Sequence, residues 1–320
     1  MPLRRLGDSG LVVSAVGMGC NTLGATVPPD AVAHVVGAAL DAGITLFDTA
    51  DIYGAAPGQS EALLGAALGR RRPDVVLATK FGMDARGLNG SDWGARGSRR
   101  YVRRAVEGSL RRLGTDYIDL LQLHEPDPRT PVDETLSALD DLVHGGLIRY
   151  AGSSNFAAWQ VVDAHHRARA AGWTGFVSAQ NEYSLLRRVA EAELVPAATS
   201  TGIGLLAYYP LASGLLTGKY RRGRPAPPGS RLEKRPERLA KADFDRIEAL
   251  EQVAGERGIS LLTLAIGGLA AQPAVGAVVV GARTPEQVRQ NAAAASWVPT
   301  PEDLAAIDAA APTGSRTPTR

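Results

Sequence analysis

The stretch "ITLFDTADIYG", residues 44–54, changes from apolar to polar within a few positions. Leu46 and Phe47 suit a strand that is buried among helices, whereas Asp48 and Tyr53 come where such a strand would end. A strand that is apolar on both faces is typical of a parallel sheet with helices packed outside it. The stretch therefore predicts a buried parallel strand, and its polar end is either an ordinary exit into a loop or part of a catalytic rim.

Seven further short runs of β-branched residues and leucine recur along the chain, so we expect eight strands in all. The seven runs begin near residues 12, 75, 118, 148, 177, 203 and 274. Most are separated by segments with apolar residues at helical spacing, such as residues 29–43 and 98–114. Regular alternation of strand and helix predicts parallel strands joined by crossovers, and eight such units close into a (β/α)8 TIM barrel of the α/β class.

Three segments lie outside this alternation. Residues 3–14, "LRRLGDSGLVVS", alternate in polarity around a turn, which predicts a β-hairpin that caps the bottom of the barrel. Residues 82–98 and 213–238 are rich in Gly, Pro and Arg and follow expected strands, which predicts extended loops on the top face. We expect one barrel domain over residues 1–311 and a disordered tail over residues 312–320.

The composition restricts the class of protein. The 320 residues are 45% hydrophobic, and 35 Lys and Arg against 33 Asp and Glu give a formal net charge of +2. This balance argues against nucleic acid or a membrane as the partner and favours a small molecule. Cys20 is the single cysteine, which excludes an intramolecular disulfide and suits a reducing compartment. No stretch reads as a signal peptide or a membrane span, so we expect a cytoplasmic protein that is a monomer or a homo-oligomer.

Polar side chains recur at the expected carboxyl ends of the strands, where the active sites of such barrels are built. They are Asp48, Tyr53, Lys80, His124, Ser154, Asn155, Gln180 and Tyr208. A strand-end Asp or Asn alone is more often a loop-capping residue. Because all of these strand ends meet on one rim, the whole set predicts an active site.

Four of these residues have coherent acid–base chemistry. A tyrosine has a reference pKa of ~10, and a neighbouring ammonium lowers that pKa by favouring the phenolate. Lys80 can supply the ammonium to Tyr53, with Asp48 keeping it charged and oriented. His124 can hydrogen-bond a carbonyl oxygen and position it for protonation. The four residues therefore predict a general acid for an oxygen that gains charge while its carbon is attacked.

The other four rim residues suit a nicotinamide. Ser154, Asn155 and Gln180 offer donors and acceptors for a carboxamide. Tyr208 offers a flat ring on which a nicotinamide can stack. The attacking species is therefore predicted to be a hydride from a nicotinamide cofactor.

The segment "GARTPEQVRQN", residues 281–291, predicts an anion site at a helix start. Thr284 is a favourable N-cap, Pro285 suits the first helical turn, and Gln287 completes a capping box. Arg283 beside this helix start is suited to a phosphate monoester. We therefore expect NADPH to be preferred over NADH because of Arg283; in the alternative, Arg283 is a solvated loop residue.

At these residues the sequence resembles the aldo-keto reductase superfamily, in particular its longer-chain bacterial branch, which also includes the β subunits of voltage-gated potassium channels. The resemblance runs from about residue 3 to about residue 310. It rests on the motifs "DTADIYG", "LATKFG", "DLLQLHEPD", "GSSNF", "QNEYSLL", "YYPLASGLLTGKY" and "GARTPEQVRQN". The resemblance implies a (β/α)8 barrel that uses NADPH or NADH to reduce aldehydes and ketones.

The resemblance also implies roles for particular residues. The family's catalytic tetrad falls on the four acid–base residues, and its carboxamide and stacking contacts fall on the other four rim residues. Further cofactor contacts are expected in the first loop, the diphosphate loop and the 2′-phosphate site. They are Gly19, Cys20 and Asn21; Pro210, Leu211, Ser213, Gly214, Leu215 and Lys219; and Gly281, Arg283, Thr284, Gln287, Gln290 and Asn291. No metal site is expected.

Two rival functions stay open. Lys80 at a strand end could be the nucleophile of a Schiff-base aldolase, although Asp48 and Tyr53 would then lack a joint purpose. The chain could also be a regulatory subunit that binds NADP(H) and reports redox state to a membrane partner. No readable motif identifies the carbonyl substrate, which could be sugar-like, or the physiological direction of the reaction.

Two aromatic residues near the expected rim have more than one interpretation. Trp93 either forms a wall of the substrate pocket or anchors its own loop. Tyr209 stands where many relatives have serine after the stacking tyrosine. Both positions bear on the shape of the pocket and therefore on the substrate.

Overall fold

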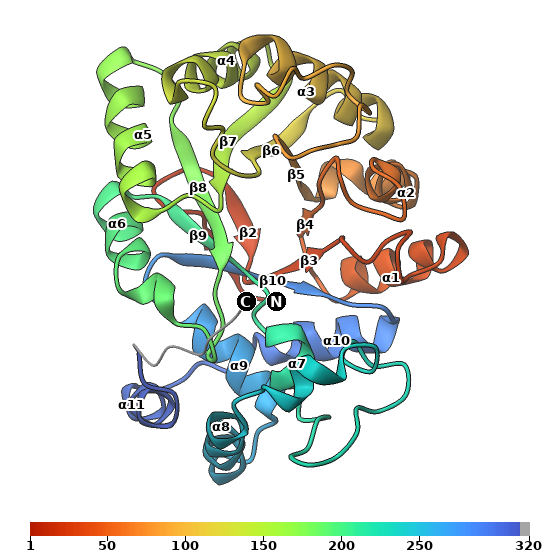
Figure 1. Cartoon of the computed structure of the whole chain (residues 1–320), viewed down its shortest axis with the longest axis vertical. Helices are drawn as coiled ribbons and strands as arrows, with labels where there is room; N and C mark the ends of the chain where they lie inside the picture. The colour runs from red at the N-terminus through yellow and green to blue at the C-terminus, as the bar shows by residue number, and fades with distance from the viewer. Residues whose placement is uncertain (314–320) are drawn as a thin grey trace.

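A computed structural model describes residues 1–313 of the chain and shows eight parallel strands that close into a barrel (Figure 1). Around the barrel the strands follow the order β10-β3-β4-β5-β6-β7-β8-β9. Their bounds are β3 Val16–Gly19, β4 Leu46–Asp48, β5 Val76–Phe81, β6 Ile118–Leu123, β7 Ile148–Ser154, β8 Phe176–Glu182, β9 Gly204–Tyr208 and β10 Val275–Gly281. The predicted (β/α)8 TIM barrel is confirmed.

Helices surround the barrel on its outer side, as Figure 1 shows. The crossovers before β9 contain α1 Pro29–Asp41, α2 Gln59–Leu68, α3 Arg99–Leu113, α4 Val132–His144, α5 Ala158–Ala171 and α6 Leu194–Thr201, with short 3-10 turns η1 Gly69–Asp74 and η2 Val189–Glu191. The crossover from β9 to β10 contains η3 Ala212–Thr217, α7 Pro236–Ala240, α8 Phe244–Glu256 and α9 Leu261–Ala270, and the helices α10 Pro285–Ala294 and α11 Pro301–Ala310 follow β10. The last crossover is therefore longer than the others.

Helix α3 illustrates how the local sequence sets these elements. The Ser98 side chain accepts a hydrogen bond from the backbone N–H of Tyr101, and Gly114 ends the helix at a φ of 63°. Val102 and Val106 are buried on the face that packs against the barrel. Burying such a side chain contributes roughly 1.5–3 kcal/mol, so the apolar stripe fixes which face of the helix turns inward.

A hairpin of β1 Leu3–Arg5 and β2 Val12–Ser14 closes the bottom of the barrel. Leu6 is wholly buried in the same apolar cluster as strand residues from the barrel interior. A Cβ at position 204 would lie 2.5 Å from the backbone nitrogen of Gly7, so glycine is needed where the hairpin meets the barrel. The predicted hairpin is confirmed. The run beginning at residue 12, however, divides into a hairpin strand and a separate barrel strand.

The two expected top-face loops, residues 82–98 and 213–238, follow β5 and β9 at the carboxyl ends of the strands. The segment 213–238 is not wholly irregular, because it contains most of η3 and the start of α7. Of the tail expected over residues 312–320, only residues 312 and 313 are described, so the prediction for residues 314–320 lies outside the described residues.

In the described part of the chain, no single helix is long and apolar enough to cross a membrane. Taken together, α8 and α9 are long and apolar enough, but the chain bends by 92° at the break between them.

Candidate active site

A buried ion pair lies at the centre of the rim. Nζ of Lys80 donates to Oδ2 of Asp48 at 2.6 Å and to the carbonyl of Thr49 at 3.0 Å. Burial by itself lowers the pKa of Lys80, but the charge of Asp48 and the neighbouring Tyr53 outweigh burial and raise that pKa above its ordinary value. The Lys80 side chain is therefore a fixed positive charge inside the barrel mouth.

The second oxygen of Asp48 is held by two glutamines. Nε2 of Gln180 donates to Oδ1 at 2.8 Å, and Nε2 of Gln122 donates to the same atom at 3.2 Å. Gln122 was missed in the sequence analysis. Gln122 lies on β6, two residues before His124, and side chains two apart along a strand share a face, so this spacing could have identified it as a site residue. Both oxygens of Asp48 are thus occupied, which fixes its orientation toward Lys80.

Tyr53 lies between the other members of the predicted tetrad. Nζ of Lys80 is 5.1 Å from the centroid of the Tyr53 ring, and the His124 ring lies 5.7 Å away, edge to face. Burial raises the pKa of Tyr53 and outweighs the opposing effect of the Lys80 charge. The prediction that Lys80 lowers the pKa of Tyr53 is therefore wrong for the net effect. The phenol keeps its proton throughout the neutral range.

His124 follows β6 and is fixed through its backbone. Its N–H donates to the carbonyl of Phe81 at 2.7 Å, and its carbonyl accepts from Nδ2 of Asn155 at 2.9 Å. Burial and then the charge of Lys80 lower the pKa of His124 to about 3, so the imidazole is neutral at neutral pH. Its buried Nδ1 has no hydrogen-bond partner among residues 1–313. A neutral ring with unused hydrogen-bonding capacity suits a polar ligand.

The structure brings the four predicted nicotinamide contacts together. Ser154 on β7 pairs in register with Gln180 on β8, and the N–H of Asn155 donates to the carbonyl of Gln180 at 3.0 Å. Nδ2 of Asn155 donates to Oγ of Ser154 at 3.2 Å, while its Oδ1 accepts from the hydroxyl of Tyr208 at 2.8 Å. Asn155 has a φ of 60°, a conformation that asparagine tolerates better than most residues. The group is a connected set of amides beside an aromatic ring.

The expected diphosphate loop has an unusual backbone. Ser213 and Gly214 have φ values of 61° and 94°. A Cβ at position 214 would lie 3.2 Å from Nζ of Lys219, so Lys219 reaches back over this turn. The N–H of Gly214 donates to the carbonyl of Leu211 at 2.8 Å, so these residues close a tight turn beside Lys219. Pro210 is buried, and Leu211 and Leu215 are half-buried beside the turn.

The helix start at residue 284 forms as expected, with one difference. The Thr284 side chain accepts from the backbone N–H of Gln287 at 3.2 Å. Oε1 of Gln287 accepts from the N–H of Arg283 at 2.9 Å, one residue before the N-cap, so the predicted capping box is wrong in its second half. The Arg283 guanidinium forms no ion pair within the described residues. Its positive charge is available to an anion.

The remaining expected cofactor contacts differ in how they are presented. Gly19 on β3 pairs with Gly281 on β10, and a Cβ at position 281 would lie 3.6 Å from Oδ1 of Asn21, so the first loop does lie beside the 281–291 segment. Gln290 is exposed but donates to Glu286, and Asn291 is buried.

Cys20 is the exception among these positions. Its side chain is wholly buried, its N–H donates to the carbonyl of Asp48, and its carbonyl accepts from Oγ of Ser60. Burial also raises the pKa of its thiol. Its thiol and main-chain groups are therefore engaged inside the protein, and its side chain is not presented to a ligand.

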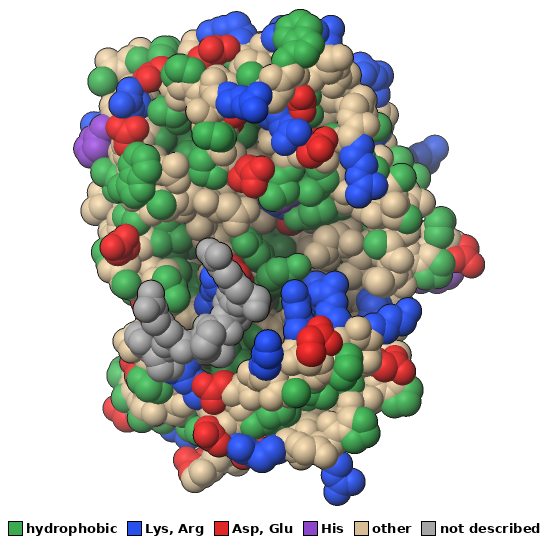
Figure 2. All heavy atoms as spheres, in the orientation of Figure 1, with side chains coloured by type: hydrophobic (Ala, Val, Ile, Leu, Met, Phe, Trp, Pro, Cys, Tyr) green, Lys and Arg blue, Asp and Glu red, His purple; other side chains and the backbone are tan. Residues whose placement is uncertain are grey.

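Arg231, from the segment 213–238, was also missed from sequence. Its Nη2 donates to the hydroxyl of Tyr209 at 3.2 Å, and its guanidinium lies 5.0 Å from the centroid of that ring. Tyr209 is 41% exposed and lies edge to face with Tyr208 at 5.3 Å. Figure 2 shows a hollow near the middle of this face, with Lys and Arg side chains along the side where α7 and α10 lie in Figure 1. The rim is positively charged on that side.

Trp93 behaves as an anchor of its own loop. The guanidinium of Arg100 lies 3.7 Å from the centroid of the Trp93 ring, and Trp93 is 72% exposed. Arg100 also donates to the carbonyl of Ser91. The stacking ties the loop to the start of α3.

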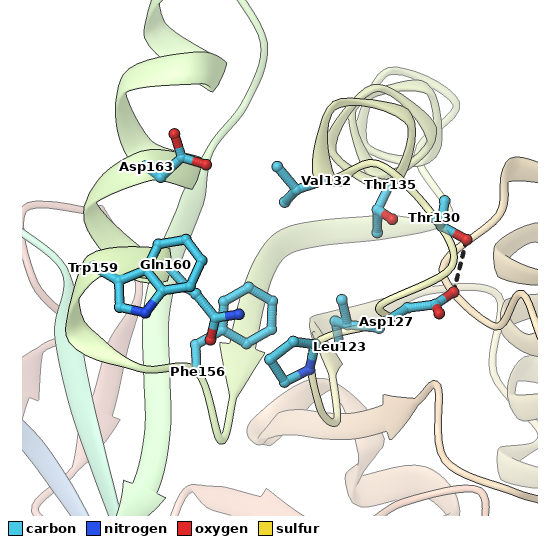
Figure 3. Close-up of a pocket in the computed structure, with 10 residues that line it drawn as sticks. Leu123, Asp127, Thr130, Val132, Thr135, Phe156, Trp159, Gln160 and Asp163 are labelled. Carbon is cyan, nitrogen blue, oxygen red and sulfur yellow. Dashed lines mark hydrogen bonds between the residues drawn. The ribbon is translucent and has the colours of Figure 1, made fainter.

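A separate pocket of about 150 Å³ lies between the starts of α4 and α5 (Figure 3). Phe156 and Trp159 supply apolar surface, and Asp127 accepts a hydrogen bond from Oγ1 of Thr130 at 2.7 Å. None of the eight rim residues lines this pocket. It is distinct from the tetrad.

Comparison with known proteins agrees with this geometry. The model of the aldo/keto reductase family matches residues 15–312. The chain belongs to the aldo/keto reductase family.

Three relatives cover most of the chain. Uncharacterized oxidoreductase YrpG of Bacillus subtilis (strain 168) is 39% identical over 89% of this chain and 88% of that protein. A probable voltage-gated potassium channel subunit beta of Oryza sativa subsp. japonica is 36% identical over 97% of this chain and 96% of its own. L-glyceraldehyde 3-phosphate reductase of Escherichia coli O157:H7 is 32% identical over 96% of this chain and 92% of that protein. The aldo/keto reductase thus resembles both oxidoreductases and channel subunits.

Proposed function

We propose that this aldo/keto reductase uses NADPH to reduce an aldehyde or ketone to the alcohol by direct hydride transfer. The observation that carries the proposal is the cluster of Asp48, Tyr53, Lys80 and His124 at the carboxyl ends of β4, β5 and β6. A reduced nicotinamide supplies a hydride when it is bound, and the protein supplies the proton and the orientation.

Tyr53 is the proton donor in this proposal. Its raised pKa keeps the phenol protonated, so the proton is present when the carbonyl oxygen gains charge. Lys80 stabilises the phenolate that is left behind, and Asp48 holds Lys80 in place at 2.6 Å. Neutral His124 donates a hydrogen bond to the carbonyl oxygen and orients it toward Tyr53.

The residues around the tetrad fit a nicotinamide dinucleotide. Nδ1 of His124, which is buried and has no partner in the described part of the chain, and the linked amides of Asn155 and Gln180 provide polar groups for a carbonyl and a carboxamide. Tyr208 offers its ring. The guanidinium of Arg283 forms no ion pair within residues 1–313 and lies beside the capped start of α10; in this proposal it recognises the 2′-phosphate and favours NADPH.

The relatives support the same class of reaction. One relative is named L-glyceraldehyde 3-phosphate reductase, and another is versiconal hemiacetal acetate reductase of Aspergillus parasiticus, 34% identical over 95% of this chain. We infer a small carbonyl compound as the partner, a sugar-like carbonyl among the candidates, and no role for nucleic acid or membrane. The near-balanced charge and the single buried cysteine favour the cytoplasm.

A regulatory subunit that binds NADP(H) is the second candidate. The 36% identity to a protein named as a potassium channel subunit beta favours it. A Lys80 Schiff-base aldolase has weaker support, because the pKa of Lys80 is raised, whereas an amine nucleophile needs a lowered pKa.

One experiment separates these functions. The purified chain is mixed with NADPH or NADH and a panel of aldehydes, ketones and sugars, and cofactor absorbance is followed. The proposal expects oxidation of NADPH with at least one carbonyl class. Tight cofactor binding without turnover across the panel would favour the regulatory subunit instead.

A further inference from the structure

Asp51 is a buried carboxylate that the proposed chemistry does not use. It is wholly buried, and its N–H donates to the carbonyl of Lys80 at 3.0 Å. The N–H of Tyr53 donates to the carbonyl of Ala50 at 3.1 Å, so Asp51 lies inside the turn that carries Tyr53. We call residues 50–53 the Tyr53 turn. Asp51 and the proposed proton donor therefore share one backbone turn.

The Asp51 side chain joins this turn to the loop of residues 82–98. Oδ2 of Asp51 accepts from Nδ2 of Asn89 at 2.8 Å. Asn89 is buried although it belongs to that loop. Oδ1 of Asp51 is buried and has no hydrogen-bond partner among residues 1–313. An ionised carboxylate with one unpartnered oxygen is unfavourable in such a place.

The groups around Asp51 form one connected cluster. Oδ1 of Asn89 accepts from Arg112 on α3 at 3.2 Å, and Arg112 donates to Glu61 on α2 at 2.6 Å. The second oxygen of Glu61 accepts from Oγ1 of Thr79 on β5 at 2.6 Å. The charged groups are thus two carboxylates and one guanidinium.

A phenol and a helix glycine complete the surroundings of this cluster. The hydroxyl of Tyr101 on α3 lies 3.5 Å from Nδ2 of Asn89. A Cβ at position 108, in the middle of α3, would lie 2.8 Å from Nη1 of Arg112 and 2.8 Å from Oδ1 of Asn89. Glycine is unfavourable inside a helix relative to alanine. Gly108 therefore leaves room for the contact between Asn89 and Arg112.

The electrostatics of the cluster place the titration of Asp51 in the neutral range. Burial and then the charge of Glu61 raise the pKa of Asp51 to about 7, against the opposing effects of the Asn89 side chain, the charge of Arg112 and the backbone of Ile52. Below that pH the carboxyl is neutral. Above it, the cluster carries one more negative charge.

We propose that Asp51 is a positioning residue whose protonation controls how firmly loop 82–98 is seated on the Tyr53 turn. When Asp51 is neutral, Asn89 stays hydrogen-bonded to it and the loop stays packed on the Tyr53 turn, which we call the seated state. Ionised Asp51 favours release of the loop, because release lets water reach the charge and the unpartnered oxygen. The loop follows β5 at the carboxyl ends of the strands, where the proposed active site lies, so we expect its release to alter substrate binding.

The sign follows from proton linkage. The seated state, with its raised pKa, holds the proton more tightly than a released state in which Asp51 is hydrated and its pKa returns to the ordinary value of 3.8. Raising the pH from about 6 to about 8.5 therefore weakens seating by about tenfold, most of it below the pKa of the seated state.

Hydrogen exchange of the loop tests this coupling without any need for activity. Amide protection over residues 82–98 is measured in the full chain at about pH 6 and about pH 8.5 and is corrected for the intrinsic exchange rate. The parent should lose protection by about tenfold at the higher pH. Asp51→Asn, a neutral side chain that can still accept from Asn89, should keep high protection at both pH values. Asn89→Ala should show low protection at both.

A matched variant and a kinetic arm complete the test. Asp41→Asn, at an exposed position on α1, should behave as the parent. The kinetic arm rests on the proposed function: the KM for a carbonyl substrate should rise with pH in the parent and stay flat in Asp51→Asn. Equal corrected protection at both pH values in the parent, or an unchanged loss in Asp51→Asn, would overturn the proposal. If no carbonyl is reduced, the proposed function fails, and the exchange data still decide the coupling.

Discussion

Replacing Tyr53 by phenylalanine removes one hydroxyl and leaves the ring in place. The ring contacts with Lys80 at 5.1 Å and His124 at 5.7 Å are preserved, and the buried pair of Lys80 and Asp48 is untouched. The hydroxyl interacts electrostatically with Lys80, and that interaction is lost. We expect a loss of stability of only about 1 kcal/mol.

The loss of activity should be far larger. General acid catalysis contributes roughly two to four orders of magnitude, which is about 3 to 5.5 kcal/mol of transition-state free energy. Tyr53 is the phenol that contacts both Lys80 and His124, so water would have to replace the lost donor. NADPH affinity should change by less than about twofold, because the amides and Arg283 are unaltered.

The assay is NADPH oxidation with a carbonyl substrate that the parent reduces, with cofactor binding followed by protein fluorescence. Tyr150→Phe, on β7 near the bottom hairpin, is the matched control and should keep parental activity. If Tyr53→Phe retained activity within about threefold of the parent, Tyr53 would not be the proton donor.

Three further outcomes are expected. Arg283→Ala should weaken NADPH by roughly tenfold or more and leave NADH nearly unchanged, while Arg289→Ala, already paired with Glu286, should spare both; equal losses for both cofactors would refute the assignment. Borohydride should trap no substrate adduct on Lys80, and an adduct there would favour the aldolase. The pKa of His124 is lowered to about 3, so the unfolded chain takes up the proton first as pH falls, and His124 lowers the free energy of unfolding by about 2 kcal/mol between pH 8 and pH 5. The raised pKa of Asp51 acts in the opposite direction over the same range, so the contribution of His124 is measured by urea unfolding as the difference between the parent and His124→Gln, and a difference that does not change with pH would contradict the prediction.

The barrel could be predicted because its signals are local. Each strand is a short apolar run and each helix an apolar stripe, so β4 and α3 could be located without knowing their partners. The boundary between the hairpin strand and β3 could not, because the chain divides where Ser14 contacts Thr45, a residue far along the sequence.

The active site could be predicted in part. Asp48 and Lys80 could be placed together because parallel strands end on one rim. Arg231 could not, since its position against Tyr209 depends on how a long loop folds back. The raised pKa of Tyr53 could not be predicted either, because the sequence identifies a charged neighbour but not how deeply the phenol is buried, and burial has the larger effect.

The pair of Asp48 and Lys80, with two glutamine amides on Asp48, has a consequence for how this fold can evolve. Two charges removed from water are costly, and apolar residues of similar size often stabilise such a place more. A barrel with apolar side chains at positions 48, 80, 122 and 180 should therefore outlast its active parent on heating. Purifying selection on these four positions would have to come from chemistry rather than from folding, and a lineage freed from catalysis should lose them first.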